Sequence, residues 1–116
     1  MAINEENDKS LFLRVFGDHP KLRIIDFLLH FKLFDMSKKE MMEGSGLSRG
    51  TFFKHFKDLE MYGLVKVTRA FGMTKLYKLN EESPVVKTLI KLDFELSKKY
   101  AESVFSMPEQ TLSIRQ

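Results

Sequence analysis

The side chains best suited to binding chemistry in this chain are basic and gathered between positions 37 and 78. That segment holds nine Lys and Arg against four Asp and Glu, and the rest of the chain holds ten against twelve. The segment therefore carries +5 and the remainder −2 of a total charge of +3. Basic charge concentrated in one segment indicates a polyanionic partner. The alternative is a solvated lysine-rich face without a partner, and charge alone does not separate the two.

Three phenylalanines stand within five positions in the stretch LSRGTFFKHF, beside a lysine and a histidine. On a helical wheel Phe52, Phe56 and Leu59 share one face, at the i, i+4, i+7 spacing that predicts a core face. Phe53 falls about 100° away, so we expect it to be turned from the core, or to lie flat on the side as a partly covered neighbour of it. The same outer stripe carries Gly50, Lys54 and Lys57.

Side chains on this outer stripe and on the strands that follow it are candidates for nucleic-acid binding. Arg49 and Lys54 are long enough to reach phosphates or guanine edges in a major groove. Gly50 would let a DNA backbone approach closely, or is merely tolerated in a first helical turn. Lysines and an arginine on the predicted strands would reach adjacent phosphates or the minor groove. The predicted DNA contacts are Ser48, Arg49, Gly50, Thr51, Phe53, Lys54, Lys57, Lys66, Arg69 and Lys75.

Catalytic and metal-binding patterns are weak by comparison. The chain has no cysteine, and its three histidines, His19, His30 and His55, lack the paired spacing of a metal site. Asp26 and His30 could form a catalytic pair at i, i+4, but no nucleophile stands in a matching context. We therefore expect no enzyme, no metal and no cofactor. The many methionines and phenylalanines indicate adaptable packing, so a small-molecule effector could bind between the long helices. No pattern of polar residues specifies the chemistry of that effector.

The length and the composition of the chain are those of a single globular domain. A chain of 116 residues with 43% hydrophobic and 30% charged residues can bury a core, and we expect one domain over 1–116. No apolar run approaches the length of a membrane span, and the acidic, polar start does not resemble a signal peptide. We expect a cytoplasmic protein.

Local signals predict the elements that position these side chains. Alternating apolar residues predict an N-terminal strand over 10–16. A helix follows over 20–32, with Asp18 or His19 as its cap and Pro20 in its first turn. Its apolar positions cover roughly 220° of the wheel, so a second element or a second subunit should cover its other side.

Two capped helices and a hairpin should come next. Ser37 with Glu40 forms the pattern of a capping box, and Ser48 should cap a helix that Gly63 ends in the left-handed conformation. Two short helices joined by a tight Gly-containing turn form a helix-turn-helix. Two strands over 64–79 would form a wing, and apolar periodicity predicts a long helix over 84–104. Residues 105–116 show no clear period and remain unassigned.

The stretch LSRGTFFKHFKDLEMYGLVKVTRAFGMTKLYKL resembles the winged helix-turn-helix of archaeal and bacterial regulators of the ArsR and MarR kind. In that family the recognition helix ends in Leu-x-x-x-Gly-Leu-Val and leads into the wing, as Leu59, Gly63, Leu64 and Val65 do here. The resemblance covers roughly 20–80, and PVVKTLIKLDFEL is similar to the C-terminal dimerisation helix of archaeal members. The metal-binding cysteines of many ArsR-type sensors are absent from the sequence.

The resemblance implies a mainly α fold with a small β-hairpin (α+β) and a sequence-specific regulator of transcription. It would bind double-stranded DNA as a homodimer, with the helix over 48–62 in the major groove and the wing over 64–79 on the backbone or minor groove. The alternative is a winged helix used for protein interaction within a larger assembly. The residues expected at the dimer interface are Val85, Leu89, Leu92, Phe94, Leu96 and Tyr100.

Overall fold

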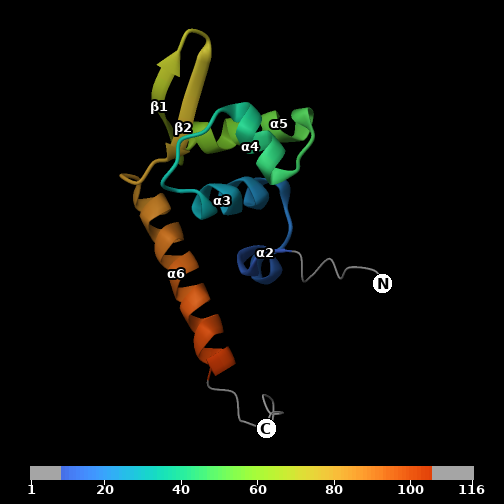
Figure 1. Cartoon of the computed structure of the whole chain (residues 1–116), viewed down its shortest axis with the longest axis vertical. Coiled ribbons are helices and arrows are strands. Elements are labelled where there is room, and N and C mark those ends of the chain that lie inside the picture. Colours follow the sequence, from blue (N-terminus) through green and yellow to red (C-terminus); the bar gives the residue numbers. More distant parts are fainter. Residues whose placement is uncertain (1–8, 106–116) are drawn as a thin grey trace.

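The structure is a computed structural model, and it describes residues 9–105. The described chain is mainly α-helical with one β-hairpin, as expected (Figure 1). The elements are α2 (Leu11–Phe16), α3 (Pro20–His30), α4 (Lys38–Ser45), α5 (Arg49–Met61), β1 (Val65–Phe71), β2 (Thr74–Leu79) and α6 (Pro84–Phe105). Most of the unassigned tail lies outside the described residues.

The helix starts agree with the capping signals of the sequence. The Ser37 Oγ accepts a hydrogen bond from the Glu40 N–H at 3.1 Å, and the Glu40 carboxylate accepts one from the Ser37 N–H at 2.9 Å. His19 caps α3 through Nδ1, and Ser48 caps α5. These bonds satisfy N–H groups that the first helical turn leaves without partners. The predicted capping box and the predicted left-handed Gly63, at φ 73°, are confirmed.

The predicted strand over 10–16 is wrong, because this segment is the helix α2. Ser10 caps it by accepting a hydrogen bond from the Leu13 N–H at 3.1 Å, and Gly17 ends it at φ 105°. Only Phe12 and Leu13 of the helix are buried. Almost every residue in this short segment is apolar, so a period of two cannot be told from a helical one.

The wing is a two-stranded antiparallel hairpin. Val65 pairs with Leu79 and Phe71 with Thr74, with an irregularity between Val67 and Arg69. An isolated bridge between Met36 and Tyr77, with N–H···O distances of 2.9 and 2.8 Å, joins the base of the hairpin to the α3–α4 loop. This bridge positions the wing against the start of α4.

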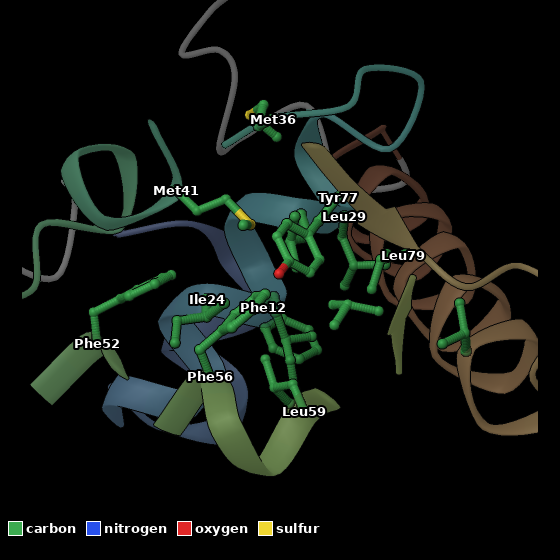
Figure 2. Packing of buried hydrophobic residues seen from close by; sticks show 14 of the residues in the cluster. Phe12, Ile24, Leu29, Met36, Met41, Phe52, Phe56, Leu59, Tyr77 and Leu79 are labelled. Carbon is green, nitrogen blue, oxygen red and sulfur yellow. The ribbon is translucent and has the colours of Figure 1, made fainter. Parts of the chain in front are cut away.

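The core lies where α3, α4, α5 and the base of the hairpin meet (Figure 2). Phe52, Phe56 and Leu59 of α5 are each at most 1% exposed, so the predicted core face of this helix is confirmed. The Phe52 and Phe56 rings stack with centroids 5.2 Å apart, and Tyr77 meets the Phe56 ring edge-on at 5.1 Å. This packing leaves the opposite side of α5 toward solvent.

Helix α6 runs away from the other elements, with α2 beside it (Figure 1). Val86 is its only buried residue among those described, while Leu89 and Ile90 pack partly against the core. Most of this 22-residue helix therefore has no partner within the described chain.

Candidate nucleic-acid interface

The first turn of α5 is held by its cap. The Ser48 Oγ donates to the Thr51 Oγ1 at 3.0 Å and accepts from the Thr51 N–H at 3.4 Å. Gly50 is exposed, and a Cβ built on it would meet no atom within 4 Å. The surface beside Gly50 is therefore open in the free protein, as a close approach by another molecule requires.

Phe53 does not point away from the core. It is half-buried, packs against the core cluster and meets the Phe52 ring edge-on at 5.4 Å. The expectation of an outward-facing ring is wrong, and the partly covered position is the one observed. A position about 100° from the centre of a core face lies at its border, and there an aromatic ring is long enough to fold back onto its neighbours.

Two cations lie close to the Phe53 ring. The Arg49 guanidinium lies 4.9 Å from the centre of the Phe53 ring, and the Lys38 ammonium lies 5.6 Å from it. Lys38 also lies 5.5 Å from the ring centres of Phe56 and Tyr77. Cation–π contacts of this kind hold charged groups in place on an aromatic face. Arg49 of α5 and Lys38 of α4 thus share Phe53 as a neighbour.

Sequence reasoning missed Lys38 and its neighbour Lys39. Both line a groove of about 380 Å³ between the start of α4 and the wing, together with Lys75 and Met73. The charge count over 37–78 includes both lysines, but it does not place them beside the wing. Their closeness to the wing depends on the bridge between Met36 and Tyr77.

The lysines predicted on α5 and the wing are exposed, but they do not form one row. Lys54 and Lys57 are exposed on α5. In the hairpin Lys66 pairs with Lys78 and Ala70 pairs with Lys75. Because directly paired residues share a face and successive residues alternate, Lys66 and Lys75 lie on opposite faces of the wing.

Arg69, a predicted phosphate contact, is engaged within the protein. Its guanidinium donates to both carboxylate oxygens of Asp35, from Nε at 2.8 Å and from Nη2 at 2.9 Å. The Thr68 hydroxyl donates to the same carboxylate at 2.6 Å. The hydrogen bond from Arg69 is the main reason that the pKa of Asp35 lies well below its usual range. Much of the charge of Arg69 is thus compensated, and its visible role is to tie the wing to the α3–α4 loop.

Two histidines that are distant in sequence are neighbours in the fold. The rings of His19 and His55 meet edge-on with centroids 5.3 Å apart. The Nδ1 of His55 is buried and has no hydrogen-bond partner among the described residues. Burial, followed by the nearby His19, lowers the pKa of His55. The neutral form of His55 is therefore favoured between α5 and the start of α3.

Asp26 and His30, the pair weighed in the sequence, lie at a cavity beside α2. Asp26 accepts a hydrogen bond from the Ser10 hydroxyl at 2.9 Å, and burial raises the pKa of Asp26. These residues line a cavity of about 670 Å³ between α2, α3 and the end of α4. In the same cavity Asp18 accepts two hydrogen bonds from Arg23. Its charged lining is largely satisfied within the chain.

Residues 9–105 contain no group of three or more His, Asp or Glu side chains placed to hold a metal ion. Within the same range no helix is long and apolar enough to cross a membrane.

The predicted dimer residues differ in their exposure. Val85, Phe94 and Tyr100 are more than half exposed, and Leu92 is 38% exposed. Leu96 is half-buried, as is Leu89, which packs against the protein's own core. Leu89 is thus partly engaged inside the chain.

No protein-family model matches the sequence, and no curated protein sequence matches it. Solved structures with a similar fold do exist. A cysteine-to-serine point mutant of Lactococcus lactis ZitR superposes with a TM-score of 0.59 at 19% identity, covering 80% of this chain and 66% of that one. This chain therefore spans slightly less than two thirds of that ZitR structure. Wild-type ZitR, a protein described as a zinc-responsive MarR family member, has also been solved in complex with DNA.

Two further structures support the same fold. FabT from Streptococcus pneumoniae, in complex with DNA, gives a TM-score of 0.59 at 13% identity and covers 87% of this chain and 68% of that one. The homodimeric DNA-binding domain of Mb0332 from Mycobacterium bovis, a possible ArsR-family regulator, gives 0.53 at 17% identity and covers 85% of this chain and 84% of that one. The chain has the winged helix-turn-helix fold that these MarR- and ArsR-type transcription regulators share.

Proposed function

We propose that this protein is a sequence-specific regulator of transcription that binds double-stranded DNA as a homodimer. Helix α5 would enter the major groove, and the wing formed by β1 and β2 would lie on the backbone or in the minor groove. The observation that carries the proposal is a set of basic side chains from α4, α5 and the wing that share an aromatic contact and a groove. Arg49 on α5 and Lys38 on α4 both lie close to the Phe53 ring, and Lys38 and Lys75 line the same groove beside the wing.

The placement of charge on this surface fits a nucleic acid. Lys54 and Lys57 are exposed on α5, and Lys39 adds a further cation to the groove. Phosphate contacts from such lysines give affinity without reading sequence, while side chains in the major groove read base edges. The open space beside Gly50 lets this part of α5 come close to a groove wall.

The exposed apolar side chains of α6 support the homodimer. Leu92 is 38% exposed, and Val85 and Tyr100, which lie on the same side of the helix, are more exposed still. Contiguous apolar surface of this kind on a small soluble protein usually marks an interface. A two-fold dimer would present two copies of α5 to successive major grooves, as helix-turn-helix dimers do.

The test is to select bound fragments from a random pool of duplex DNA and to measure their affinity against salt concentration. We expect one recurring sequence and a loss of affinity of about 10³-fold or more between ~50 and ~200 mM salt, if the dimer neutralises six or more phosphates. Binding that is insensitive to salt, or no binding to any duplex, would instead support a protein-interaction module.

Matched variants divide this surface into base-reading and phosphate-binding parts. Lys54→Gln should change which sequence is selected, whereas Lys75→Gln should weaken all duplexes alike and reduce the salt slope by about one. Lys98→Gln is the control, because Lys98 is an exposed lysine on α6, away from this surface.

A further inference from the structure

The tip of the wing is apolar and open to solvent. Phe71 is 57% exposed and Met73 is 99% exposed, with Gly72 between them. Large apolar side chains are costly to leave in water at the end of a protruding hairpin. Neither side chain contributes to the buried core of the described chain. The exposure therefore needs an explanation outside the packing of the free protein.

The tip is also held in a defined position. Gly72 lies at φ 57°, a conformation that allows a tight two-residue turn, and Phe71 pairs with Thr74 directly below that turn. The Arg69 guanidinium lies 5.5 Å from the centre of the Phe71 ring and binds Asp35 of the α3–α4 loop. The apolar tip is thus connected to the body of the protein through a charged clamp.

Lysines stand next to this apolar tip. Met73 lines the same groove as Lys38, Lys39 and Lys75. Lys75 lies only two residues beyond Met73 and is exposed. A protein surface that accepted Met73 would have to accommodate this cluster of like charges too. DNA can accept both kinds of side chain, because its phosphates bind lysines and its bases offer an apolar contact between those phosphates.

We propose that Phe71 and Met73 form an apolar wedge that enters the minor groove of DNA and partly unstacks a base step. The inference rests on the proposed function and deepens it by assigning an apolar contact between base steps to the tip of the wing. The B-DNA minor groove is only about 6 Å wide, so a narrow two-residue turn fits where a helix does not. Proteins that insert Phe or Met between base steps bend the duplex by roughly 20–90°.

The wedge adds a source of specificity that α5 does not supply. Unstacking costs less at flexible pyrimidine–purine steps such as TA and CA, so sites with such a step under the wing should bind more tightly. Specificity at that position would come from DNA deformability rather than from hydrogen bonds to bases. The lysines beside the tip would neutralise the phosphates that bending brings closer to the protein.

The experiment uses the full chain and a selected duplex that carries a donor and an acceptor dye at its two ends. The double variant Phe71→Ala/Met73→Ala should bind at least about fivefold more weakly, the low end of what stacking of an aromatic side chain on a base contributes. Its salt slope should match that of the wild type, because no phosphate contact is removed. Energy transfer between the dyes should fall, because the duplex is bent less.

Two controls accompany this measurement. Val15→Ala removes a side chain that is 51% exposed on α2, outside the proposed DNA-binding surface, and it should leave affinity and bending unchanged. Thermal melting of the double variant should match that of the wild type, since both side chains are mainly exposed.

If wild type binds DNA, and the double variant binds and bends it equally, the wedge is excluded and the proposed function stands. A lower oligomeric mass of the double variant would assign the tip to contact between copies, which also excludes the wedge. If wild type binds no duplex at all, both the proposed function and the wedge fall.

Discussion

At the scale of single residues, the three phenylalanines of α5 should differ in their contribution to stability. Phe52 and Phe56 are at most 1% exposed, so replacing either with alanine should cost about 3–5 kcal/mol of unfolding free energy. Phe53 is half-buried, and its replacement should cost roughly 1 kcal/mol, since only part of its surface leaves water on folding. Urea unfolding of the three variants checks this, and equal losses for Phe52→Ala and Phe53→Ala would contradict it.

Two glycines of the helix-turn-helix should respond in opposite ways to the same substitution. A Cβ on Gly44 would clash with the Phe27 ring, whereas a Cβ on Gly50 meets no atom within 4 Å. Gly44→Ala should therefore lower stability by about 1–3 kcal/mol, the usual cost of overpacking. Gly50→Ala should leave stability unchanged or raise it by up to about 1 kcal/mol, because alanine favours helix.

The two glycine variants should also differ in DNA binding. If α5 approaches DNA closely at Gly50, Gly50→Ala should weaken DNA binding although the protein is at least as stable. Thermal melts and DNA titrations of both variants decide the matter. Unchanged DNA affinity of Gly50→Ala would mean that Gly50 is merely tolerated in the first helical turn.

At the scale of elements, Asp35 should decide how firmly the wing is held and how that hold depends on pH. The bond from Arg69 keeps the pKa of Asp35 well below its usual range, so the folded protein favours the ionised carboxylate. The resulting stability is fully present above the unfolded-state value of about 4 and is lost as pH falls below it toward the folded-state pKa. Asp35→Asn should therefore destabilise the protein at pH 7, and its difference from the wild type should shrink in acid.

Melting temperatures of wild type and Asp35→Asn at pH 7 and at pH 3 test this expectation. Amide hydrogen exchange should also be faster in β1 and β2 of the variant, because the wing loses its tie to the α3–α4 loop. Glu43→Gln is the matched control, since Glu43 is exposed on α4. If the difference in melting temperature between wild type and Asp35→Asn is larger at pH 3 than at pH 7, the expected pH dependence is wrong.

At the scale of the whole molecule, α6 should mediate the homodimer through the face that carries Leu92. At about 100° per residue, Val85, Leu92 and Tyr100 lie on one side of the helix, and Phe94 lies nearly opposite Leu92. Leu92→Asp/Tyr100→Asp should reduce the solution mass to that of one 13.6 kDa chain, because charged groups in an apolar interface are costly. Leu89 is less suitable for this test, because it packs against the protein's own core.

Analytical ultracentrifugation at micromolar concentration measures the mass, and Lys98→Glu controls for a change of charge on the same helix. A monomeric wild type would overturn the dimer. If the double variant is still a dimer and Phe94→Asp is a monomer, the interface lies on the opposite face of α6. The monomeric variant should also bind DNA weakly, because each half-site is then bound alone.

The sequence by itself determined the order and limits of most elements, because their signals are local. The side chains of Ser37 and Glu40 bond to each other's backbone within one helical turn, and Gly63 can adopt its left-handed conformation with little help from distant residues. The core face of α5 was also predictable, since residues at i, i+4 and i+7 of a helix share a face wherever the helix lies.

Tertiary structure decided the contacts between elements, because those contacts depend on how distant segments pack. Lys38 lies close to Phe53 and Arg69 binds Asp35 only in the folded arrangement, in which the α3–α4 loop also pairs with the wing through Met36 and Tyr77. The segment that forms α2 is nearly all apolar, so its periodicity cannot distinguish helix from strand, and burial of Phe12 and Leu13 as a pair favours the helix. The pairing register, which no single strand encodes, separates Lys66 from Lys75 onto opposite faces of the wing.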